Sequence, residues 1–320
     1  MAALAAAAVN RLKTGFRPAT LSAYTRMLKD FLAFLHLADI PLNQVTTIIV
    51  LSFMEFLAQN GLSHSNIANH MAGIRALLIM YGLDTSPFKD ERITLFLKSV
   101  KINAPLNPMI SNLVSLDLLR QIVDSCDQLK DPLVFKALYL FMFYSFLRLS
   151  NVLPHSTKMF DVTRHLTRGD LIFSQSVCTV IVKWSKTLQD RRETTTIAIP
   201  VLPDSPVCPV SALKAMFSAY PAHKNDPLFV LCHTGVPVPL ADSQARKHLK
   251  KISQLLNIQP YLTFHVFRRS GTTCAFQAGV PLQDLMAHGT WSSNAVWRYI
   301  KSVPSASSPV SRAFQASLLP

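Results

Sequence analysis

Acidic residues are scarce in this chain, which contains 18 Asp and Glu against 32 Lys and Arg. The formal net charge is therefore +14 at pH 7, and the isoelectric point is near 9.8. Such an imbalance argues against cationic partners and favours a polyanion, of which nucleic acid is the commonest. On charge alone, the alternative is a basic, solvated surface that binds no polymer.

Cysteines are few and scattered. No two of them form a CxxC pair, and Cys232 with His233 has no second ligand pair at zinc spacing. We therefore expect reduced thiols, no structural metal and no cofactor, in a nuclear protein if the source is eukaryotic and a cytoplasmic one otherwise. The five cysteines are Cys126, Cys178, Cys208, Cys232 and Cys274.

Long apolar runs are also missing, since none approaches the roughly 18 residues that a membrane span needs. The richest run, residues 133–147, is interrupted by Lys136 and is typical of a core helix. The first nine residues are alanine-rich without a charged leading segment, which argues against a secretion signal. We expect neither a membrane partner nor a signal peptide.

The pattern of residues 18–102 predicts a small helical bundle. Tyr24, Leu28, Phe31 and Leu35 are spaced 4, 3 and 4 residues apart, which lines one helical face. Similar apolar stripes recur over three further segments, and Asn60-Gly61 and Gly82 can end helices between them. Residues 1–17 are expected to be a tail.

Residues 103–113 carry two prolines and little periodicity, which is typical of a linker. Residues 114–301 then predict a second domain of helices with one small sheet. The β-rich segments 171–173, 177–182 and 194–199 are separated by polar turns and predict three antiparallel strands. The fold class is thus mostly α, of the α+β kind. Residues 302–320 are expected to be a C-terminal tail.

The richest concentration of chemically capable side chains lies between His265 and Tyr299. His265 and Arg268 are three residues apart, which places them on one side of a helix. A Gly-x-Trp segment ending at Trp291 follows before Tyr299. A lone His-x-x-Arg pair is most often structural, so its interpretation depends on residues upstream.

Two cations upstream complete this set. Arg148 ends a very apolar predicted helix, where burying a guanidinium without a nearby acid would be costly. A distant Asp or Glu partner is the alternative. Lys186 follows Lys183 in the turn between two predicted strands, where a lysine is usually only solvated.

In order along the chain, the arginine, the hairpin lysine, the His-x-x-Arg pair, the Gly-x-Trp segment and the final tyrosine resemble the tyrosine recombinase family. The resemblance covers nearly the whole chain. The sequence segments 147–151, 289–295 and 298–300 are similar, more particularly, to those of the recombinases of DIRS and Ngaro retrotransposons. The resemblance implies DNA cleavage and rejoining through a covalent 3′-phosphotyrosyl link, in recombination or integration of a mobile element.

The resemblance also implies a role for each matching residue. Tyr299 would be the nucleophile, while Arg148 and Arg268 would bracket the scissile phosphate. Lys186 would protonate the leaving 5′ oxygen, and His265 would assist proton transfer. These residue types suit the chemistry, because guanidiniums bind phosphate oxygens bidentately and a lysine among cations has a lowered pKa.

Two departures from the family pattern stand out. Many members carry an acid where Asn151 stands, so this amide or some other group must orient Arg148. The position that is usually His or Trp falls on Thr290, with Trp291 one residue later and His288 two residues earlier. Trp291 is the residue that we assign to the site, and the other two remain candidates.

The resemblance further implies two domains that clamp double-stranded DNA. The first domain would present a polar face around its third helix, although a merely solvated face explains that pattern equally well. We expect a monomer in solution that assembles into a homo-oligomer on DNA, in part through the tail. The predicted DNA-binding residues are Asn66, Asn69, His70, Arg75 and Lys183.

Three other functions compete with an active recombinase. A catalytically inactive DNA-binding remnant would not need all of the five matching catalytic residues. A type IB topoisomerase would share the chemistry, but the N-terminal bundle favours a recombinase. A helical interaction scaffold would leave the ordered cations without a purpose.

Overall fold

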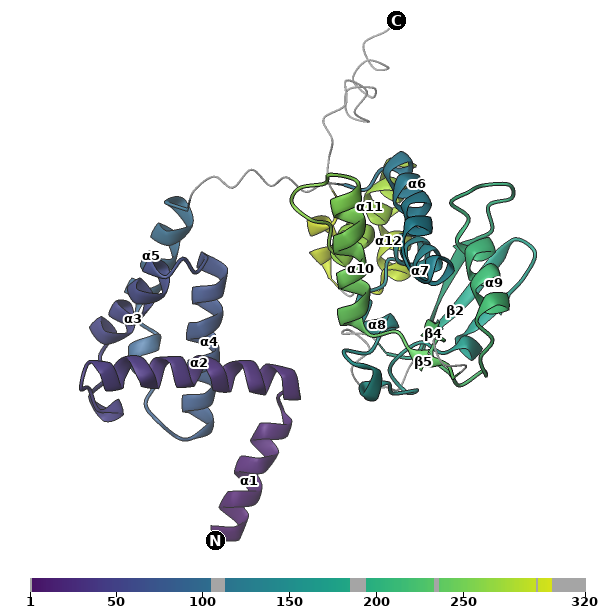
Figure 1. The fold of residues 1–320 in the computed structure, drawn as a ribbon. Helices are drawn as coiled ribbons and strands as arrows, with labels where there is room; N and C mark the ends of the chain where they lie inside the picture. The colour runs from purple at the N-terminus through teal and green to yellow at the C-terminus, as the bar shows by residue number, and fades with distance from the viewer. Residues whose placement is uncertain (1, 105–112, 185–193, 233–235, 292, 301–320) are drawn as a thin grey trace, which may run out of the picture. The chain divides into compact units, whose positions relative to one another are not determined.

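The computed structural model describes residues 2–104, 113–184, 194–232, 236–291 and 293–300. The chain divides into two compact units, residues 1–109 and 110–320. Figure 1 shows the helices of unit 1 and the mixed structure of unit 2. Each unit buries a hydrophobic cluster of its own.

Unit 1 is built from helices alone among its described residues. The predicted stripes are its core: Phe31, Val50, Phe53 and Ile67 are fully buried. Gly73 lets two helices cross closely, because a Cβ there would lie 2.7 Å from the Tyr24 ring. Its elements are α1 (Ala2–Thr14), α2 (Pro18–Leu37), η1 (Leu42–Gln44), α3 (Thr47–Gln59), α4 (His64–Met80), η2 (Ser86–Phe88) and α5 (Glu91–Ile102).

Residues 1–17, expected to be a tail, contain helix α1. Six of the first eight residues are alanine, the residue with the highest helix propensity, which accounts for helix formation without an apolar stripe. The helix α5 begins at Glu91, because the Asp90 carboxylate caps it by accepting from the Arg92 N–H at 2.9 Å.

Unit 2 combines helices with a small sheet (Figure 1). Its helices are α6 (Leu116–Ser125), α7 (Pro132–Ser145), α8 (Leu149–Val152), α9 (Pro209–Ala219), α10 (Asp242–Leu255), α11 (Phe264–Gln277) and α12 (Leu282–His288). Its strands are β1 (Leu171–Phe173), β2 (Val177–Val182), β3 (Thr195–Pro200), β4 (Val230–Leu231) and β5 (Val238–Pro239). Its 3₁₀ turns are η3 (Cys126–Gln128), η4 (Thr157–Met159), η5 (Arg168–Asp170) and η6 (Asn294–Arg298).

The predicted three-stranded antiparallel sheet is confirmed, in the order β1-β2-β3. Alternate residues of β2 face the core, so Cys178, Val180 and Val182 are buried. Cys178 pairs with Ile199 and Val180 with Ile197, which continues the buried face into β3. The mostly helical fold class is therefore confirmed. The pair β4-β5 was not predicted, because two-residue strands are too short to show alternation.

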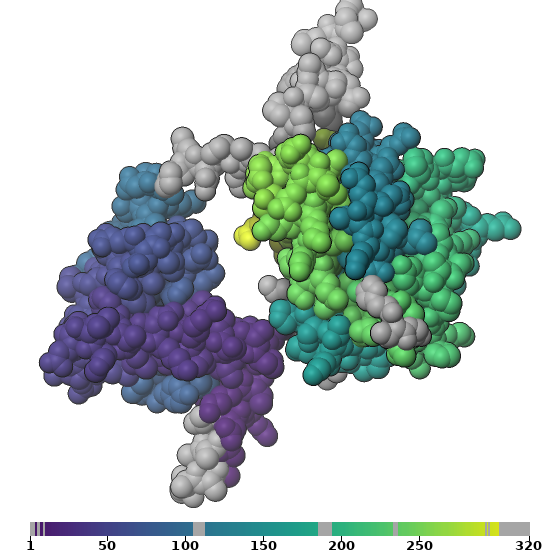
Figure 2. All heavy atoms as spheres, in the orientation of Figure 1, coloured from purple at the N-terminus to yellow at the C-terminus, as the bar shows by residue number. Residues whose placement is uncertain are grey.

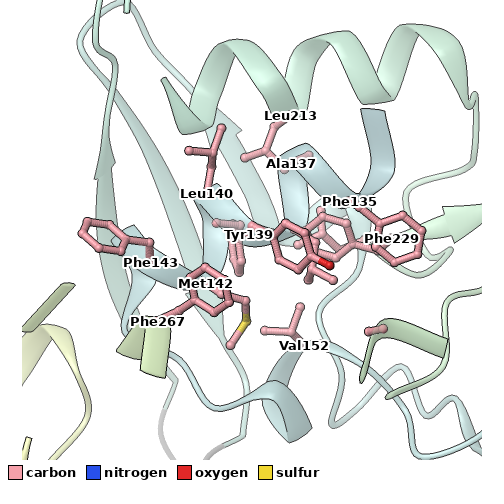
Figure 3. Packing of buried hydrophobic residues seen from close by; sticks show 14 of the residues in the cluster. Phe135, Ala137, Tyr139, Leu140, Met142, Phe143, Val152, Leu213, Phe229 and Phe267 are labelled. Carbon is pink, nitrogen blue, oxygen red and sulfur yellow. The ribbon is translucent and has the colours of Figure 1, made fainter. Parts of the chain in front are cut away.

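The centre of unit 2 is α7, most of whose residues are apolar and buried. Its residues from Ala137 to Phe143 are buried, and Figure 3 shows their packing against neighbouring elements. The Tyr139 ring stacks on Phe267 of α11 with 5.4 Å between ring centroids. The Tyr139 hydroxyl is satisfied at 2.7 Å from Nδ1 of His248. This core holds α11 against α7. Within the described part of the chain, no helix has the length and apolar character needed to span a bilayer.

Gly271 makes the close contact of α11 with α7 possible. A Cβ at this position would collide with the carbonyl oxygen of Phe143 and with the Phe146 ring. Gly271→Ala is therefore expected to lower the free energy of unfolding by about 1–3 kcal/mol through overpacking. Urea denaturation measures this change, with the exposed Gln277→Ala as the control. An unchanged unfolding midpoint for Gly271→Ala would contradict the tight packing.

Candidate active site

Arg148 lies where α7 ends and α8 begins. Phe146 adopts a left-handed conformation (φ 52°) that turns the chain sharply after α7. Arg148 then precedes the first residue of α8 in an extended conformation. Its side chain is half-buried, and its Nη1 is buried with no hydrogen-bond partner among the described residues. A buried N–H without an acceptor is costly, so this atom is suited to an anion brought by a ligand.

Arg268 is the largest fully buried side chain, with 1% of its surface exposed. Its guanidinium donates to the carbonyl oxygens of Phe146 and Gly289, the latter at 2.8 Å. Burial, followed by the nearby charge of Arg148, lowers the pKa of Arg268. Arg268 therefore joins α11 to the end of α7 and to the turn after α12, and it supplies a positive charge inside the protein.

Trp291 covers the Arg268 guanidinium. The guanidinium carbon is 3.9 Å from the centre of the Trp291 ring system, which is a close cation–π contact. The two preceding residues, Gly289 and Thr290, make this position of the Trp291 ring possible. Thr290 has a positive φ of 55°, unusual for a β-branched residue, and reverses the chain after α12. A Cβ on Gly289 would overlap the Trp291 ring.

The three candidates for the His or Trp position make different contacts in the structure. Trp291 contacts both Arg268 and Tyr299, and its ring centroid is 5.0 Å from that of Tyr299. His288 instead donates from Nε2 to the Tyr144 carbonyl at 2.8 Å. Thr290 acts in the backbone turn. Trp291 is also the better donor, because its buried Nε1 has no partner among the described residues.

Tyr299 and His265 complete the cluster. The Tyr299 ring centroid lies 4.9 Å from that of His265 and 5.1 Å from the Arg268 guanidinium carbon. The backbone of Tyr299 is tied to α11, because the Thr273 hydroxyl donates to its carbonyl at 3.0 Å. Tertiary packing thus brings together residues from the end of α7, from α11 and from the turns after α12.

His265 is held in its neutral form. Its pKa is lowered, first by burial and then by the positive charges of Arg269, Arg268 and Arg148. A neutral imidazole can accept a proton at neutral pH, which is what a partner of a phenol nucleophile needs.

Of the two lysines in the predicted turn after β2, the structure describes only Lys183. The Lys183 ammonium forms an ion pair with Asp170 at 2.6 Å, and Thr167 donates to the same carboxylate oxygen. Lys183, predicted to bind DNA, is thus occupied by an internal contact. Lys186 lies outside the described residues. Asn151 is buried, and its side chain donates to the carbonyl of Trp184, two residues after the end of β2.

The polar face predicted on α4 is only partly open. Asn66 and Asn69 are exposed, whereas His70 and Arg75 are half-buried. His70 lies between the Asn66 carbonyl, at 2.9 Å, and the Asp30 carboxylate of α2, at 3.8 Å. The helix α2 presents a second polar face that was not predicted. Its exposed residues are Ser22, Thr25, Arg26 and Lys29. Their spacing opposite the apolar stripe was the signal in the sequence.

A basic surface on α10 was also missed. Arg246, Lys247, Lys250 and Lys251 are exposed, while Ala245, Leu249 and Ile252 face the core. Figure 2 shows α10, in green, on the surface of unit 2 beside α6. The run Arg246-Lys247-His248-Leu249-Lys250-Lys251 carried this signal in the sequence. Of these cations, Arg246 pairs with Asp242, one turn earlier. Among the described residues, no group of three His, Cys, Asp or Glu side chains could hold a metal ion.

Comparisons with known proteins agree with this arrangement. Residues 113–304 match the phage integrase family, and residues 2–80 match the phage integrase SAM-like domain. No curated protein sequence matches the chain significantly.

Several solved structures share the fold at low sequence identity. A lambda integrase dimer bound to a COC′ core site has 14% identity and a TM-score of 0.62, over 92% of this chain and 76% of that one. The Tn1549 transposon integrase in complex with transposon right end DNA has 15% identity and a TM-score of 0.59, over 87% of each chain. XerH recombinase bound to difH substrate has 15% identity and a TM-score of 0.57, over 87% and 72%.

The glycine before Thr290 provides a test of the Trp291 position. Gly289→Ala is expected to push the indole away from Arg268 and to cost about 1–3 kcal/mol in the free energy of unfolding. Urea denaturation gives the energy. Trp291 fluorescence, isolated in a Trp184→Phe/Trp297→Phe background, should shift toward that of a solvent-exposed indole. Ala287→Ser, at an exposed position on α12, is the control. An unshifted spectrum in Gly289→Ala would contradict the stacked geometry.

Proposed function

The chain belongs to the phage integrase family of tyrosine recombinases, and from this membership we propose that it cleaves and rejoins double-stranded DNA through a 3′-phosphotyrosyl intermediate on Tyr299. The observation that carries the proposal is the cluster of Tyr299, His265, Arg268 and Trp291, with the charge of Arg148 beside it. Arg148 is far in sequence from the other four residues, and these side chains have little reason to gather in a protein that only binds DNA.

In the proposed first step, the Tyr299 oxygen attacks the scissile phosphorus. A bond forms between the phenolic oxygen and phosphorus, and the bond from phosphorus to the 5′ oxygen breaks. Neutral His265, next to the Tyr299 ring, takes up the phenolic proton. Lys186 gives a proton to the departing 5′ oxygen. Reversal by a 5′ hydroxyl of another strand rejoins the DNA, and the phosphotyrosyl bond conserves the energy of the phosphodiester.

The two arginines would contribute in different ways. Arg148 has a buried N–H without a partner among the described residues, so it is free to bind a non-bridging phosphate oxygen. Arg268 donates two hydrogen bonds to backbone carbonyls, and these bonds would fix the position of its positive charge beneath the phosphate. The indole N–H of Trp291 is a further donor for the phosphate. Preorganised donors of this kind stabilise charge that develops in the transition state.

We propose DNA as the partner of both units. The net charge of +14 supplies general attraction, and the basic residues of α10 provide a contact surface in unit 2. In unit 1, the exposed parts of α2 and α4 would face the duplex, with Asn66 and Asn69 reaching base edges. The comparison structures were solved with DNA bound to the Tn1549 integrase, XerH and lambda integrase.

The organisation that we propose is a DNA-binding domain over residues 18–102, a linker over 103–113, a catalytic domain over 114–301 and a tail over 302–320. The protein would be a monomer that assembles on paired DNA sites. The sequence segments 147–151 and 289–295 support the proposal that the chain is a mobile-element recombinase of the DIRS and Ngaro kind. In a eukaryotic source the enzyme would act in the nucleus, and otherwise in the cytoplasm.

The decisive test is covalent capture on a nicked suicide substrate. The wild-type chain is expected to form a protein–DNA adduct that denaturing electrophoresis resolves. Tyr299→Phe should form none and keep its DNA affinity, because only one oxygen is removed. Adduct formation by Tyr299→Phe would refute the assignment of the nucleophile. DNA binding without any wild-type adduct would instead identify an inactive DNA-binding remnant.

The lowered pKa of His265 predicts how cleavage depends on pH. A group whose pKa is depressed keeps its neutral form until the pH falls below the ordinary value of 6.5. The single-turnover rate should therefore stay level through pH 6.5 and drop only in more acidic buffer. The charged groups that face His265 are the guanidiniums of Arg269, Arg268 and Arg148. His265→Asn should lack this acidic drop, and a drop centred above pH 6.5 would contradict the prediction.

The tail can be tested separately from the chemistry. Deleting residues 302–320 is expected to spare adduct formation on a single site, since every described member of the cluster is retained. Recombination between two sites should fall strongly, because the tail is proposed to contact a neighbouring copy. Gel-shift assays on one-site and two-site DNA report assembly directly. Full recombination by the deletion variant would show that the tail has no role in assembly.

A further inference from the structure

Asn151 connects two parts of unit 2 that are far apart in sequence. Its side chain is 2% exposed, and its Nδ2 donates to the carbonyl oxygen of Trp184 at 2.6 Å. Its backbone N–H donates to the Arg148 carbonyl at 2.8 Å. Asn151 is thus fixed to the segment that carries Arg148 and, through its side chain, holds the chain that leaves β2.

Two further contacts hold the same stretch of chain. The Arg164 guanidinium lies over the Trp184 ring, 4.6 Å from its centroid. Lys183, one residue earlier, pairs with Asp170, whose carboxylate is held in turn by Thr167. A backbone bond, a ring contact and an ion pair therefore act on two consecutive residues.

The partner of Asn151 also explains the type of residue. Trp184 offers a carbonyl oxygen, which can only accept a hydrogen bond. An amide donates to it, whereas an ionised carboxylate would place negative charge against the carbonyl dipole. The neutral residue is therefore required by this contact, even though many family members carry an acid at this position.

We propose that Asn151 is a positioning residue that acts on the β2 hairpin and not on the orientation of Arg148. By holding Trp184, it fixes the point from which the chain continues to Lys186, two residues further on. This inference rests on the proposed function, in which Lys186 protonates the 5′ oxygen. Arg164 serves the same end through its contact with the Trp184 ring.

The experiment exploits the need for a general acid. When the bond from phosphorus to the 5′ oxygen breaks, that oxygen must gain a proton. A substrate with sulfur in place of the 5′ oxygen loses a thiolate, which leaves without a proton. A variant that impairs only the general acid therefore cleaves the ordinary DNA slowly and the sulfur-substituted DNA at a normal rate.

The variants are Asn151→Asp, which removes the donor with little change in volume, and Arg164→Ala, at an exposed position where folding is at little risk. Ser150→Ala, at the exposed neighbour on α8, is the matched control. Each variant should slow adduct formation on ordinary DNA by roughly 10- to 100-fold, within the range that a general acid contributes. On sulfur-substituted DNA, both should recover to within about threefold of the wild type, as Lys186→Ala should.

Other results would overturn the proposal. Equal slowing of Asn151→Asp on both substrates would place its role at Arg148 or in the fold. Wild-type rates for Asn151→Asp and Arg164→Ala on ordinary DNA would show that the contacts at Trp184 have no bearing on the chemistry. If Lys186→Ala were rescued and the two variants were not, the positioning role alone would fail. Absence of adduct from the wild-type chain on either substrate would overturn the proposed function as well.

Discussion

The candidate site depends on the burial of one guanidinium. Arg268 lies almost completely inside unit 2, where removing a charge from water is expensive unless hydrogen bonds compensate. The compensation comes from the carbonyls of Phe146 and Gly289 and from the face of Trp291. Each of these partners lies at the end of a helix or in a turn, so their contacts with the guanidinium also fix the end of α7 and the turn after α12. The charge and its supports form one structural unit.

The backbone around Arg268 also adopts conformations that keep the buried guanidinium and its partners in place. Phe146 and Thr290 both have positive φ angles, and each turns the chain so that a neighbouring residue can reach the arginine or the tyrosine. Gly271 and Gly289 supply space where a Cβ would collide with the α7 backbone or with the indole. Strained and side-chain-free positions therefore gather around the cluster, as is common where a structure maintains a demanding geometry. The pKa of His265 is lowered first by burial and then by the same concentration of positive charge.

At Lys183 and Trp184, which follow β2, the contacts depend instead on the pairing of each donor with an acceptor. Asn151 meets a carbonyl, and Lys183 meets a carboxylate already held by Thr167. Lys183, which was predicted to bind DNA, follows the last residue of β2 and forms an ion pair with Asp170. Either the amide of Asn151 or another group was expected to orient Arg148, and the bond of Asn151 to Trp184 links the arginine segment to the hairpin. Neither partner lies close in sequence, so spacing could not have revealed these pairs.

Much of this protein was determined by the sequence itself. The helical stripes of unit 1 and the β-rich segments of the sheet are local patterns that the sequence shows directly, whereas the order of Arg148, His265, Arg268, Trp291 and Tyr299 was interpreted through its resemblance to a known family. The tertiary structure decided which of Thr290, Trp291 and His288 joins the cluster, because that choice depends on the φ angle of Thr290 and the missing Cβ of Gly289. It also decided that α2 covers part of α4, and that α10 presents its basic face. The physical reason is that burial and partner choice arise from contacts between segments distant in the chain, whereas spacing reports only which residues one helix or strand places on the same side.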